Sequence, residues 1–224
     1  MRKLYGVPGT RSSRVSWALA ELELDYEFVP VRLREGEGRS PAFLQLNPAG
    51  KVPVLVDGDV TLAESQAILT YLGDRYGSGQ AIPAAGSARR ARHDMLACFV
   101  LSELEQPLWL AARHRFVYPE SHRVPAILPS CAAEWQRAST ALAALLDPLP
   151  DYALGVQFTM VDILIAHTLQ WAKQAENPLP DTLEAYRARC YARPAATRHQ
   201  AAEQARMDQA RAQAADARAA LDEA

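Results

Sequence analysis

Two short polar clusters in the first third of the chain have residue types suited to holding an anion. Glu64 and Ser65 stand where an apolar run ends and a helical pattern begins. Thr10, Ser12 and Ser13 follow a Pro-Gly pair and open another helical pattern in the same way. Amides at a helix N-terminus and the helix dipole favour a negative charge, and a hydroxyl can donate a hydrogen bond to it. The alternative is ordinary capping, in which these side chains only satisfy free helix amides.

Composition and charge limit the class of protein. The chain has 224 residues, of which 49% are hydrophobic, so it holds enough apolar material for two small domains. Its 24 Lys and Arg residues nearly balance its 26 Asp and Glu residues. We therefore expect no general affinity for nucleic acid or for an anionic membrane. No apolar stretch reaches the roughly 20 residues that a membrane helix needs.

Cysteines and histidines are too scattered to suggest a metal centre or a disulfide framework. Cys98, Cys131 and Cys190 form no Cys-x-x-Cys pair, which fits a reducing cytoplasm. The five histidines show no metal-ligand spacing. We therefore predict a cytoplasmic protein that binds no metal and carries no dithiol chemistry of its own.

Hydrophobic periodicity predicts an α/β domain followed by an all-helical domain. The first 76 residues show strand and helix patterns in the order β-α-β-α-β-β-α. The first two strands are joined by a helix, which predicts parallel pairing, and an Asp-Gly pair predicts a hairpin for the last two. Only helical patterns follow a segment rich in Gly, Ala and Pro. We expect an α/β domain over 1–77, a linker over 78–86 and a helical domain over 87–224, whose tail from 197 is a solvated helix.

Three stretches together carry a resemblance to a known family: Leu4–Val15, Asn47–Leu55 with Leu62–Ile68, and Phe158–Ile163. In this order and spacing they are similar to the cytosolic glutathione S-transferases, over about residues 3–198. The subgroup that they resemble most contains bacterial and fungal enzymes with a serine-type active site. The resemblance implies a thioredoxin-like first domain, an all-α second domain and a homodimer, whose usual contact face matches Gln66 and the helix after Ser87.

The resemblance also implies how glutathione, an anionic tripeptide with a thiol, is held. The Val52-Pro53 peptide bond would be cis and would present the backbone of Val52 to the tripeptide. Ser65 would hold the γ-glutamyl carboxylate, and Glu64 would accept from the amino group. The alternative for Pro53 is an edge-strand proline in a plain hairpin.

The glycyl carboxylate of glutathione has two candidate partners. Arg39 matches one member of a basic pair found in related plant-type enzymes, whereas Gly38 replaces the other member. A guanidinium suits bidentate binding of a carboxylate. Lys51, which adjoins Val52, is the second candidate. The alternative for Arg39 is a solvated position in a loop.

The group that activates the thiol should stand at the start of the first helix. Ser12 matches a serine of the most similar subgroup, and Thr10 matches the serine of theta-like members, so we favour Ser12 and then Thr10. Arg11 stands where cysteine-type members carry their cysteine. This difference argues against a mixed disulfide with the protein, and Arg11 is expected to assist glutathione binding instead. Alternatively, Ser12 or Thr10 is only the N-cap of the helix.

The resemblance implies a detoxifying transferase that conjugates the glutathione thiolate to small hydrophobic electrophiles. Trp109 and Phe116 are candidates for the electrophile pocket, although aromatic residues at helical spacing more often belong to a core. Glutathione would be a co-substrate, and no other cofactor is expected. The alternatives are glutathione-dependent reduction of peroxides or disulfides, and a non-catalytic protein that binds glutathione or hydrophobic molecules.

Overall fold

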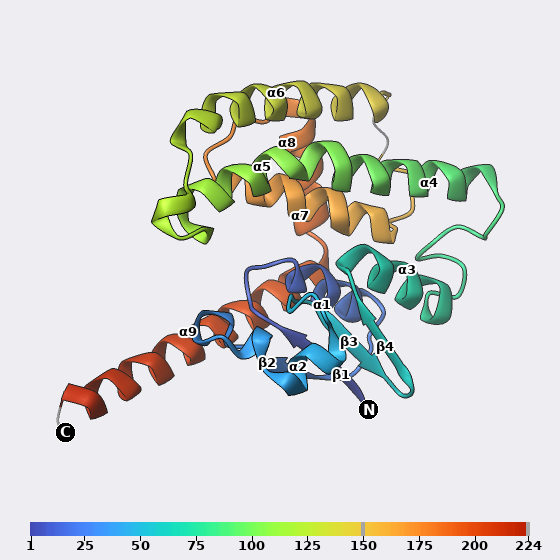
Figure 1. Ribbon diagram of the computed structural model, residues 1–224. Helices are drawn as coiled ribbons and strands as arrows, with labels where there is room; N and C mark the ends of the chain where they lie inside the picture. The colour runs from blue at the N-terminus through green and yellow to red at the C-terminus, as the bar shows by residue number, and fades with distance from the viewer. Residues whose placement is uncertain (149–150, 223–224) are drawn as a thin grey trace. The chain divides into compact units, whose positions relative to one another are not determined.

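Contacts divide the protein into two compact units (Figure 1). The computed structural model describes residues 1–148 and 151–222, with side chains described as far as residue 212. The first unit combines Met1–Leu72 with Arg193–Ala224, and the second is Gly73–Ala192. The sequence predicts a boundary at 78–86 and a tail that belongs to the helical domain. The contacts differ from this prediction because the C-terminal helix packs against the first helix of the chain.

The first unit has a mixed four-stranded sheet in the order β2-β1-β3-β4. Its strands are β1 (Arg2–Gly6), β2 (Tyr26–Pro30), β3 (Val54–Asp57) and β4 (Val60–Ala63). β1 and β2 pair in parallel, whereas β1–β3 and β3–β4 pair antiparallel. This confirms the predicted parallel pair and hairpin, with Gly58 at the hairpin turn in a left-handed conformation (φ 65°). The arrangement is a thioredoxin-like domain.

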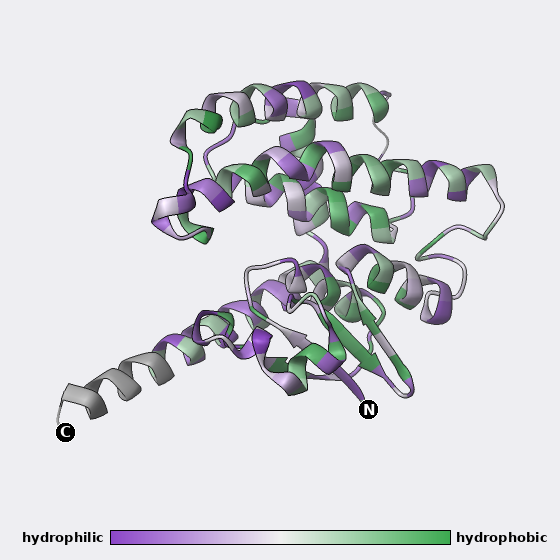
Figure 2. Ribbon diagram, viewed as in Figure 1, coloured by the Kyte–Doolittle hydropathy of each residue, from purple (hydrophilic) through white to green (hydrophobic). Residues whose placement is uncertain are grey.

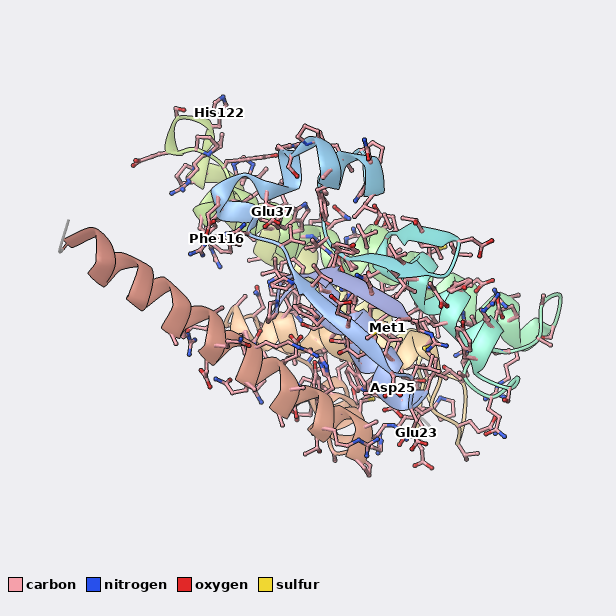
Figure 3. The ribbon with its side chains drawn as sticks, turned by 90° about the horizontal axis from the view of Figure 1, so that it is seen from below. Met1, Glu23, Asp25, Glu37, Phe116 and His122 are labelled. Carbon is pink, nitrogen blue, oxygen red and sulfur yellow. The ribbon has the colours of Figure 1, made fainter. Side chains whose placement is uncertain are left out.

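Four helices accompany this sheet, along with two 3₁₀ turns before the second helix. They are α1 (Ser12–Glu21), α2 (Pro41–Leu46), α3 (Ser65–Tyr76) and α9 (Pro194–Asp222), with turns at Leu33–Glu35 and Glu37–Arg39. Glu37, on the segment before α2 (Figure 3), accepts from the Arg32 backbone amide at 2.8 Å and thereby closes this loop.

Side chains alternate across the sheet and build two layers of core. Tyr5 and Val54 pair across β1 and β3, and both belong to an apolar cluster with Phe43 of α2. Their neighbours Leu4 and Leu55 therefore point to the opposite face, where both are fully buried. Figure 2 shows β3 as largely hydrophobic, as expected for a central strand covered on both faces.

The second unit consists of helices. They are α4 (Ala88–Phe99), α5 (Glu105–Ala112), α6 (Leu128–Leu145), α7 (Met160–Gln174) and α8 (Asp181–Tyr191). π-helical turns at Val100–Leu104 and Arg113–Val117 extend α4 and α5, and 3₁₀ turns lie at Glu120–His122 and Pro125–Ile127. Together with the first unit this confirms the predicted fold class, a thioredoxin-like domain and a helical one.

A capping box starts α7, as the Thr-x-x-Asp spacing of the sequence predicts. The Thr159 amide donates to Asp162 Oδ2 at 2.7 Å. Asp162 is fully buried and also accepts from the Ala153 amide and the Tyr186 hydroxyl. Burial raises the pKa of Asp162, and these hydrogen bonds act in the opposite direction. The role of Asp162 is therefore structural.

One helical stretch is long and apolar enough to cross a membrane, contrary to the expectation from sequence. It spans Ala88–Val117, and its best window has a mean hydropathy of 1.2. Of that window, 44% is buried inside the structure, so part of its hydrophobicity serves the helical core. Length and composition alone do not separate such a core helix from a membrane span.

Candidate glutathione site

Strand register brings three of the predicted segments to one edge of the sheet. Val54, the first residue of β3, pairs with Tyr5 near the end of β1 and with Ala63, the last residue of β4. Val52–Pro53 precedes β3, and Glu64–Ser65 follows β4, so both lie at this edge. The loop from β1 to α1, which carries the candidate hydroxyls, starts there too. Segments separated by some fifty residues in sequence therefore meet at one edge of the sheet.

The segment before β3 presents an open backbone. The Val52–Pro53 peptide bond is cis, as the resemblance implies, and Pro53 is buried. Among the residues that the structure describes, none makes a backbone hydrogen bond with Val52. The side chain of buried Asn47 shapes the preceding turn: its Nδ2 donates to the Lys51 carbonyl at 2.7 Å, and its Oδ1 accepts from the Ala49 amide at 3.0 Å. Val52 is thereby held in place for an extended ligand.

The start of α3 combines a helix N-terminus with a buried cation. Glu64 is exposed and has a positive φ of 65°, and Ser65 is buried as the first residue of α3. Arg14 of α1 is fully buried, and its Nη1 donates to Ser65 Oγ at 3.3 Å. Both the helix amides and the guanidinium favour an anion beside Ser65. Sequence reasoning missed Arg14, although a charged residue on the apolar side of α1 was a usable signal.

The hydroxyls at the start of α1 differ in burial and in their partners. Ser12 is fully buried, and its Oγ accepts from the Val7 amide at 3.2 Å and from the Thr10 hydroxyl at 3.1 Å. A Cβ at Gly6 would lie 2.8 Å from the Cβ of Ser12, so only glycine leaves room there. Thr10 is half-buried, and its hydroxyl lies 2.7 Å from the Val7 carbonyl. Burial therefore favours Thr10 for direct contact with a ligand, whereas the sequence favours Ser12.

The remaining residues at this helix start are already engaged in the structure. Arg11 is half-buried at the N-cap position of α1. Ser13 is buried, and its hydroxyl donates to Glu203 of α9. Ser13 is thus a weaker candidate for binding a ligand than either Thr10 or Ser12.

The two candidate partners of the glycyl carboxylate lie at one turn. A Cβ at Gly50 would lie 2.6 Å from the Gly38 carbonyl oxygen and 3.1 Å from Nη1 of Arg39. Gly38 and Gly50 therefore allow their two loops to touch, which sets the Arg39 guanidinium beside Gly50, the residue before Lys51. Arg39 and Lys51 are both exposed. The glycine at position 38 is thus required by packing, where related enzymes have a basic residue.

Comparison with known proteins agrees with this arrangement. The family model for the glutathione S-transferase N-terminal domain matches residues 2–74. A glutathione transferase structure from Methylococcus capsulatus aligns with a TM-score of 0.79 and 27% identity, covering 91% of this chain and 99% of that one. The chain is thus similar to glutathione S-transferases, by sequence over its first domain and by fold over most of its length. Its helical unit is accordingly the C-terminal domain of a transferase fold.

The curated relatives match less than half of this chain. Glutathione S-transferase 3 of Zea mays is 46% identical over 91 residues, which are 39% of this chain and 41% of the relative. A zeta class glutathione S-transferase of Euphorbia esula is 41% identical over 106 residues, covering 47% and 46% respectively. The matched region spans less than half the length of these curated relatives. The predicted serine-type subgroup therefore stays a prediction.

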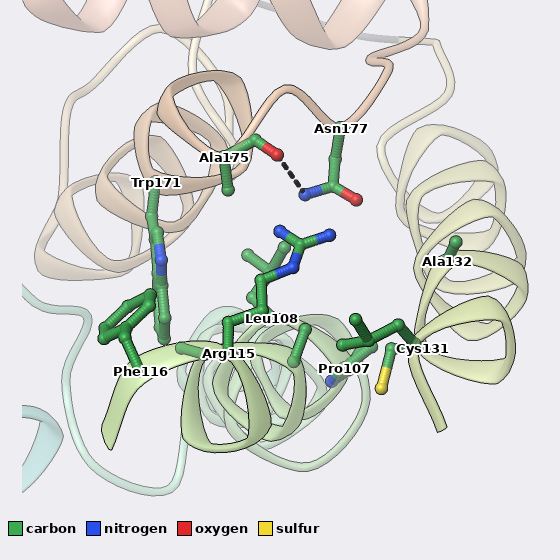
Figure 4. A pocket seen from close by; sticks show the side chains of 12 residues that line it. Pro107, Leu108, Arg115, Phe116, Cys131, Ala132, Trp171, Ala175 and Asn177 are labelled. Atoms are coloured by element: carbon green, nitrogen blue, oxygen red, sulfur yellow. Dashed lines mark hydrogen bonds between the residues drawn. The ribbon is translucent and has the colours of Figure 1, made fainter. Parts of the chain in front are cut away.

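The helical domain contains an open hollow of about 420 Å³, a volume that includes the solvent at its mouth (Figure 4). Phe116, one of the two residues predicted for the electrophile pocket, lines it together with Trp171 and Arg115. Trp109, the other predicted residue, packs against Trp171 with ring centroids 6.5 Å apart. Phe116 is 67% exposed and so is available to a ligand. Cys131 also lines the hollow, and burial raises the pKa of its thiol.

Within the part of the chain that the structure describes, no group of three or more His, Cys, Asp or Glu side chains has the arrangement of a metal site.

Proposed function

We propose that this protein binds glutathione at the edge of its sheet and activates the thiol for transfer to small hydrophobic electrophiles. One observation supports this most: Ser65 opens α3 beside buried Arg14, close to the open backbone of Val52. Glutathione needs an anion site and an extended backbone partner next to each other. A capping serine alone would need neither the buried arginine nor the unpaired strand entry.

The proposed binding mode uses the full length of this edge. The γ-glutamyl carboxylate binds Ser65 and the first amides of α3, and exposed Glu64 accepts from the amino group. The cysteinyl portion pairs with the backbone of Val52. The glycyl carboxylate reaches the turn where Arg39 and Lys51 lie.

Thr10 and Ser12 supply the hydrogen bond that stabilises the thiolate in this proposal. Their oxygens are 3.1 Å apart, so they act as one unit at the start of α1, with Arg11 beside them. A hydroxyl donor and the helix dipole lower the thiol pKa without titrating themselves. The sulfur then forms a bond to the electrophilic carbon, and the leaving group departs with its electron pair. Glutathione is a co-substrate here, and no resident cofactor is proposed.

Calorimetry with glutathione and the Ser65→Ala variant tests the binding mode. The variant removes a donor to a charged group, which weakens binding by roughly 1–3 kcal/mol, or about 5- to 150-fold in Kd. Thr61→Ala is the matched control, since Thr61 is an exposed hydroxyl on neighbouring β4. Equal affinity of the Ser65 variant and the unmodified protein would reject the γ-glutamyl assignment.

Thr10→Ala and Ser12→Ala together identify the hydroxyl that contacts the thiolate. Loss of one hydrogen bond to the anion raises the pKa of the bound thiol by about one to two units. Ultraviolet absorbance of the bound thiolate, measured against pH, reads this shift directly. We expect the larger shift for Thr10→Ala, because Ser12 is fully buried. If neither variant shifts the titration, the donor lies elsewhere and the assignment to this pair is wrong.

Two other functions remain to be separated from conjugation. Glutathione-dependent reduction of peroxides or disulfides uses the same activated thiol, although Arg11 in place of a cysteine does not favour a mixed disulfide with the protein. A non-catalytic binding protein would hold glutathione without lowering the pKa of its thiol. Turnover with an activated aryl halide, and separately with a peroxide, distinguishes conjugation from reduction, and a thiol titrating like free glutathione indicates the binding protein.

We also propose a cytoplasmic homodimer, from the family resemblance and from the match of Gln66 and α4 to the usual contact face. Sedimentation at micromolar concentration tests this directly. A species of twice the chain mass of 24.6 kDa is expected, and a stable monomer would contradict the proposal.

A further inference from the structure

The C-terminal helix makes polar contacts with the loop that carries the thiol-activating hydroxyls. The sequence predicts that the tail from 197 is solvated, yet His199 and Glu203 are only 7% and 6% exposed. Figure 1 shows α9 beginning beside α1, and the two helices are in contact. The prediction of a solvated extension is therefore wrong for the first turns of α9.

Glu203 is the residue of α9 that reaches the loop between β1 and α1. Its Oε2 accepts from the Gly9 amide at 2.9 Å and from the Ser13 hydroxyl. Ser13 Oγ in turn accepts from the same Gly9 amide at 3.2 Å. Gly9 has a positive φ of 73°, so it forms the turn that leads directly to Thr10. A single carboxylate thus holds both ends of this turn.

The turn is held from its other side by the hydroxyls already described. Thr10 reaches the Val7 carbonyl, and Ser12 accepts from the Val7 amide. These two bonds close the loop at Val7 but do not involve the Gly9 amide. Glu203 and Ser13 accept from that amide, and this fixes the direction in which the chain enters α1.

Groups from three elements surround the Glu203 carboxylate. Arg206 Nη1 lies 3.6 Å from its Oε1, and the Arg206 guanidinium stacks over Phe28 of β2 with its Cζ 4.4 Å from the ring centroid. Ser16 of α1 is 3.5 Å from Oε1 and 3.2 Å from Nδ1 of His199. The carboxylate is therefore paired and held in one position, as a positioning group requires.

We propose that Glu203 is a positioning residue of the thiol site: it holds the Gly9 turn so that the Thr10 hydroxyl is pre-placed for the glutathione thiolate. This rests on the proposed function for the identity of the thiol. Glu203 is hydrogen-bonded to Gly9 and Ser13, and it acts on the position of Thr10 through this loop. Its contribution is geometric, because small displacements of a donor reduce the stabilisation of developing charge.

The competing explanation is that Glu203 merely fastens α9 to the domain. A second, independent contact fastens the same helix: Arg193 donates to Glu21 at 2.7 and 2.9 Å, and Trp17 donates to the same carboxylate at 3.0 Å. Arg193 lies at the start of α9, away from the Gly9 turn. Arg193→Ala therefore loosens the helix without removing the contact to the loop, and serves as the matched control.

The experiment compares Glu203→Ala, Glu203→Gln and Arg193→Ala in the full chain. For Glu203→Ala we expect amide exchange at Gly9 to rise about tenfold or more, while exchange in β1 is unchanged. We expect kcat with an activated aryl halide to fall by about tenfold, with glutathione affinity within about threefold. Glu203→Gln keeps an acceptor of the same length and should restore most of both values. Arg193→Ala should leave Gly9 exchange and kcat nearly unchanged.

Two results would overturn the proposal. One is an unchanged rate of Gly9 exchange in Glu203→Ala, because the carboxylate then does not hold the turn. The other is the same loss of kcat in Arg193→Ala and Glu203→Ala, because general loosening of α9 then explains the effect. The exchange measurement needs no glutathione, so it tests the Glu203 contact by itself. If the unmodified protein does not bind glutathione, the proposed function is contradicted, and the exchange result still decides whether Glu203 holds the turn.

Discussion

Protonation of His199 should destabilise the protein between pH 6.5 and pH 4. His199 is buried between α9 and α1, stacked on Trp17 with the rings 7° from parallel, and its Nδ1 lies 3.2 Å from the Ser16 hydroxyl. Burial lowers its pKa from 6.5 to about 4, because the charged ring loses its hydration, and Arg206 acts in the same direction. The nearby Glu203 carboxylate opposes the shift but does not cancel it.

The sign and size of the effect follow from this difference in pKa. Between pH 6.5 and 4 the unfolded chain binds a proton at His199 that the folded protein does not bind, so the free energy of unfolding decreases as the pH falls. One pKa unit corresponds to about 1.4 kcal/mol. At pH 4.5 the loss from this single side chain is about 2.5 kcal/mol relative to pH 7.5.

Urea unfolding of the unmodified protein and of His199→Asn at several pH values measures this loss. Asparagine keeps an acceptor for Ser16 but does not titrate. At pH 7.5 the variant should be less stable by about 1 kcal/mol because it loses the stacking on Trp17. Near pH 6, where the loss from His199 reaches about 1 kcal/mol, the two stabilities should become equal, and at lower pH the variant should be the more stable one. His122→Asn, the same substitution at an exposed histidine, is the control.

A constant difference between the unmodified protein and His199→Asn from pH 7.5 to pH 4.5 would refute the reasoning. It would show that His199 takes up its proton equally well in the folded and the unfolded state, so that burial does not exclude the charge.

Two further substitutions test the packing around the site and in the helical domain. Gly50→Ala should lower the free energy of unfolding in urea by about 2–4 kcal/mol and weaken glutathione binding, because its Cβ would lie 2.6 Å from the Gly38 carbonyl oxygen. Gly58→Ala is the control: Gly58 has a similar φ and nothing within 4 Å of its Cβ, so the loss should be only about 1 kcal/mol. Equal losses in the two variants would argue against the contact. Asp162→Ala should cost about 3–5 kcal/mol by the same assay, since it removes the buried acceptor of the Tyr186 hydroxyl and of the Ala153 and Thr159 amides, and a loss below about 1 kcal/mol would contradict that role.

Local patterns in the sequence were sufficient to predict the strands and helices of the first domain. The Asp-Gly pair specifies a tight turn, and the helix between the first two strands requires a parallel crossover, so the sheet follows from residues close to one another in the chain. The binding roles of Val52, Pro53, Glu64 and Ser65 came from the family resemblance and stay a prediction. Each lies at the end of a strand or the start of a helix, where residue type and position are strongly linked.

The sequence ranked the hydroxyls of the thiol site only through the family resemblance, with Ser12 before Thr10. Thr10 and Ser12 are two residues apart, and either suits the start of a helix. Their difference depends on burial: the absence of a Cβ at Gly6 lets Ser12 pack against β1, while Thr10 stays half-buried. Burial is a property of the packed domain, so only the tertiary structure separates the two.

The return of the C-terminal helix to the first domain also required the tertiary structure. Glu203 bonds to Gly9 across 194 residues, and no local pattern carries information over that distance. The first turns of α9 pack through His199 and Glu203, paired with serines of α1. Hydrophobic periodicity detects only apolar faces of a helix. A helix that packs through buried polar pairs is therefore predicted to be solvated. The sequence alone thus determined the strands and helices, whereas the fold decided what holds the turn at Gly9 in place.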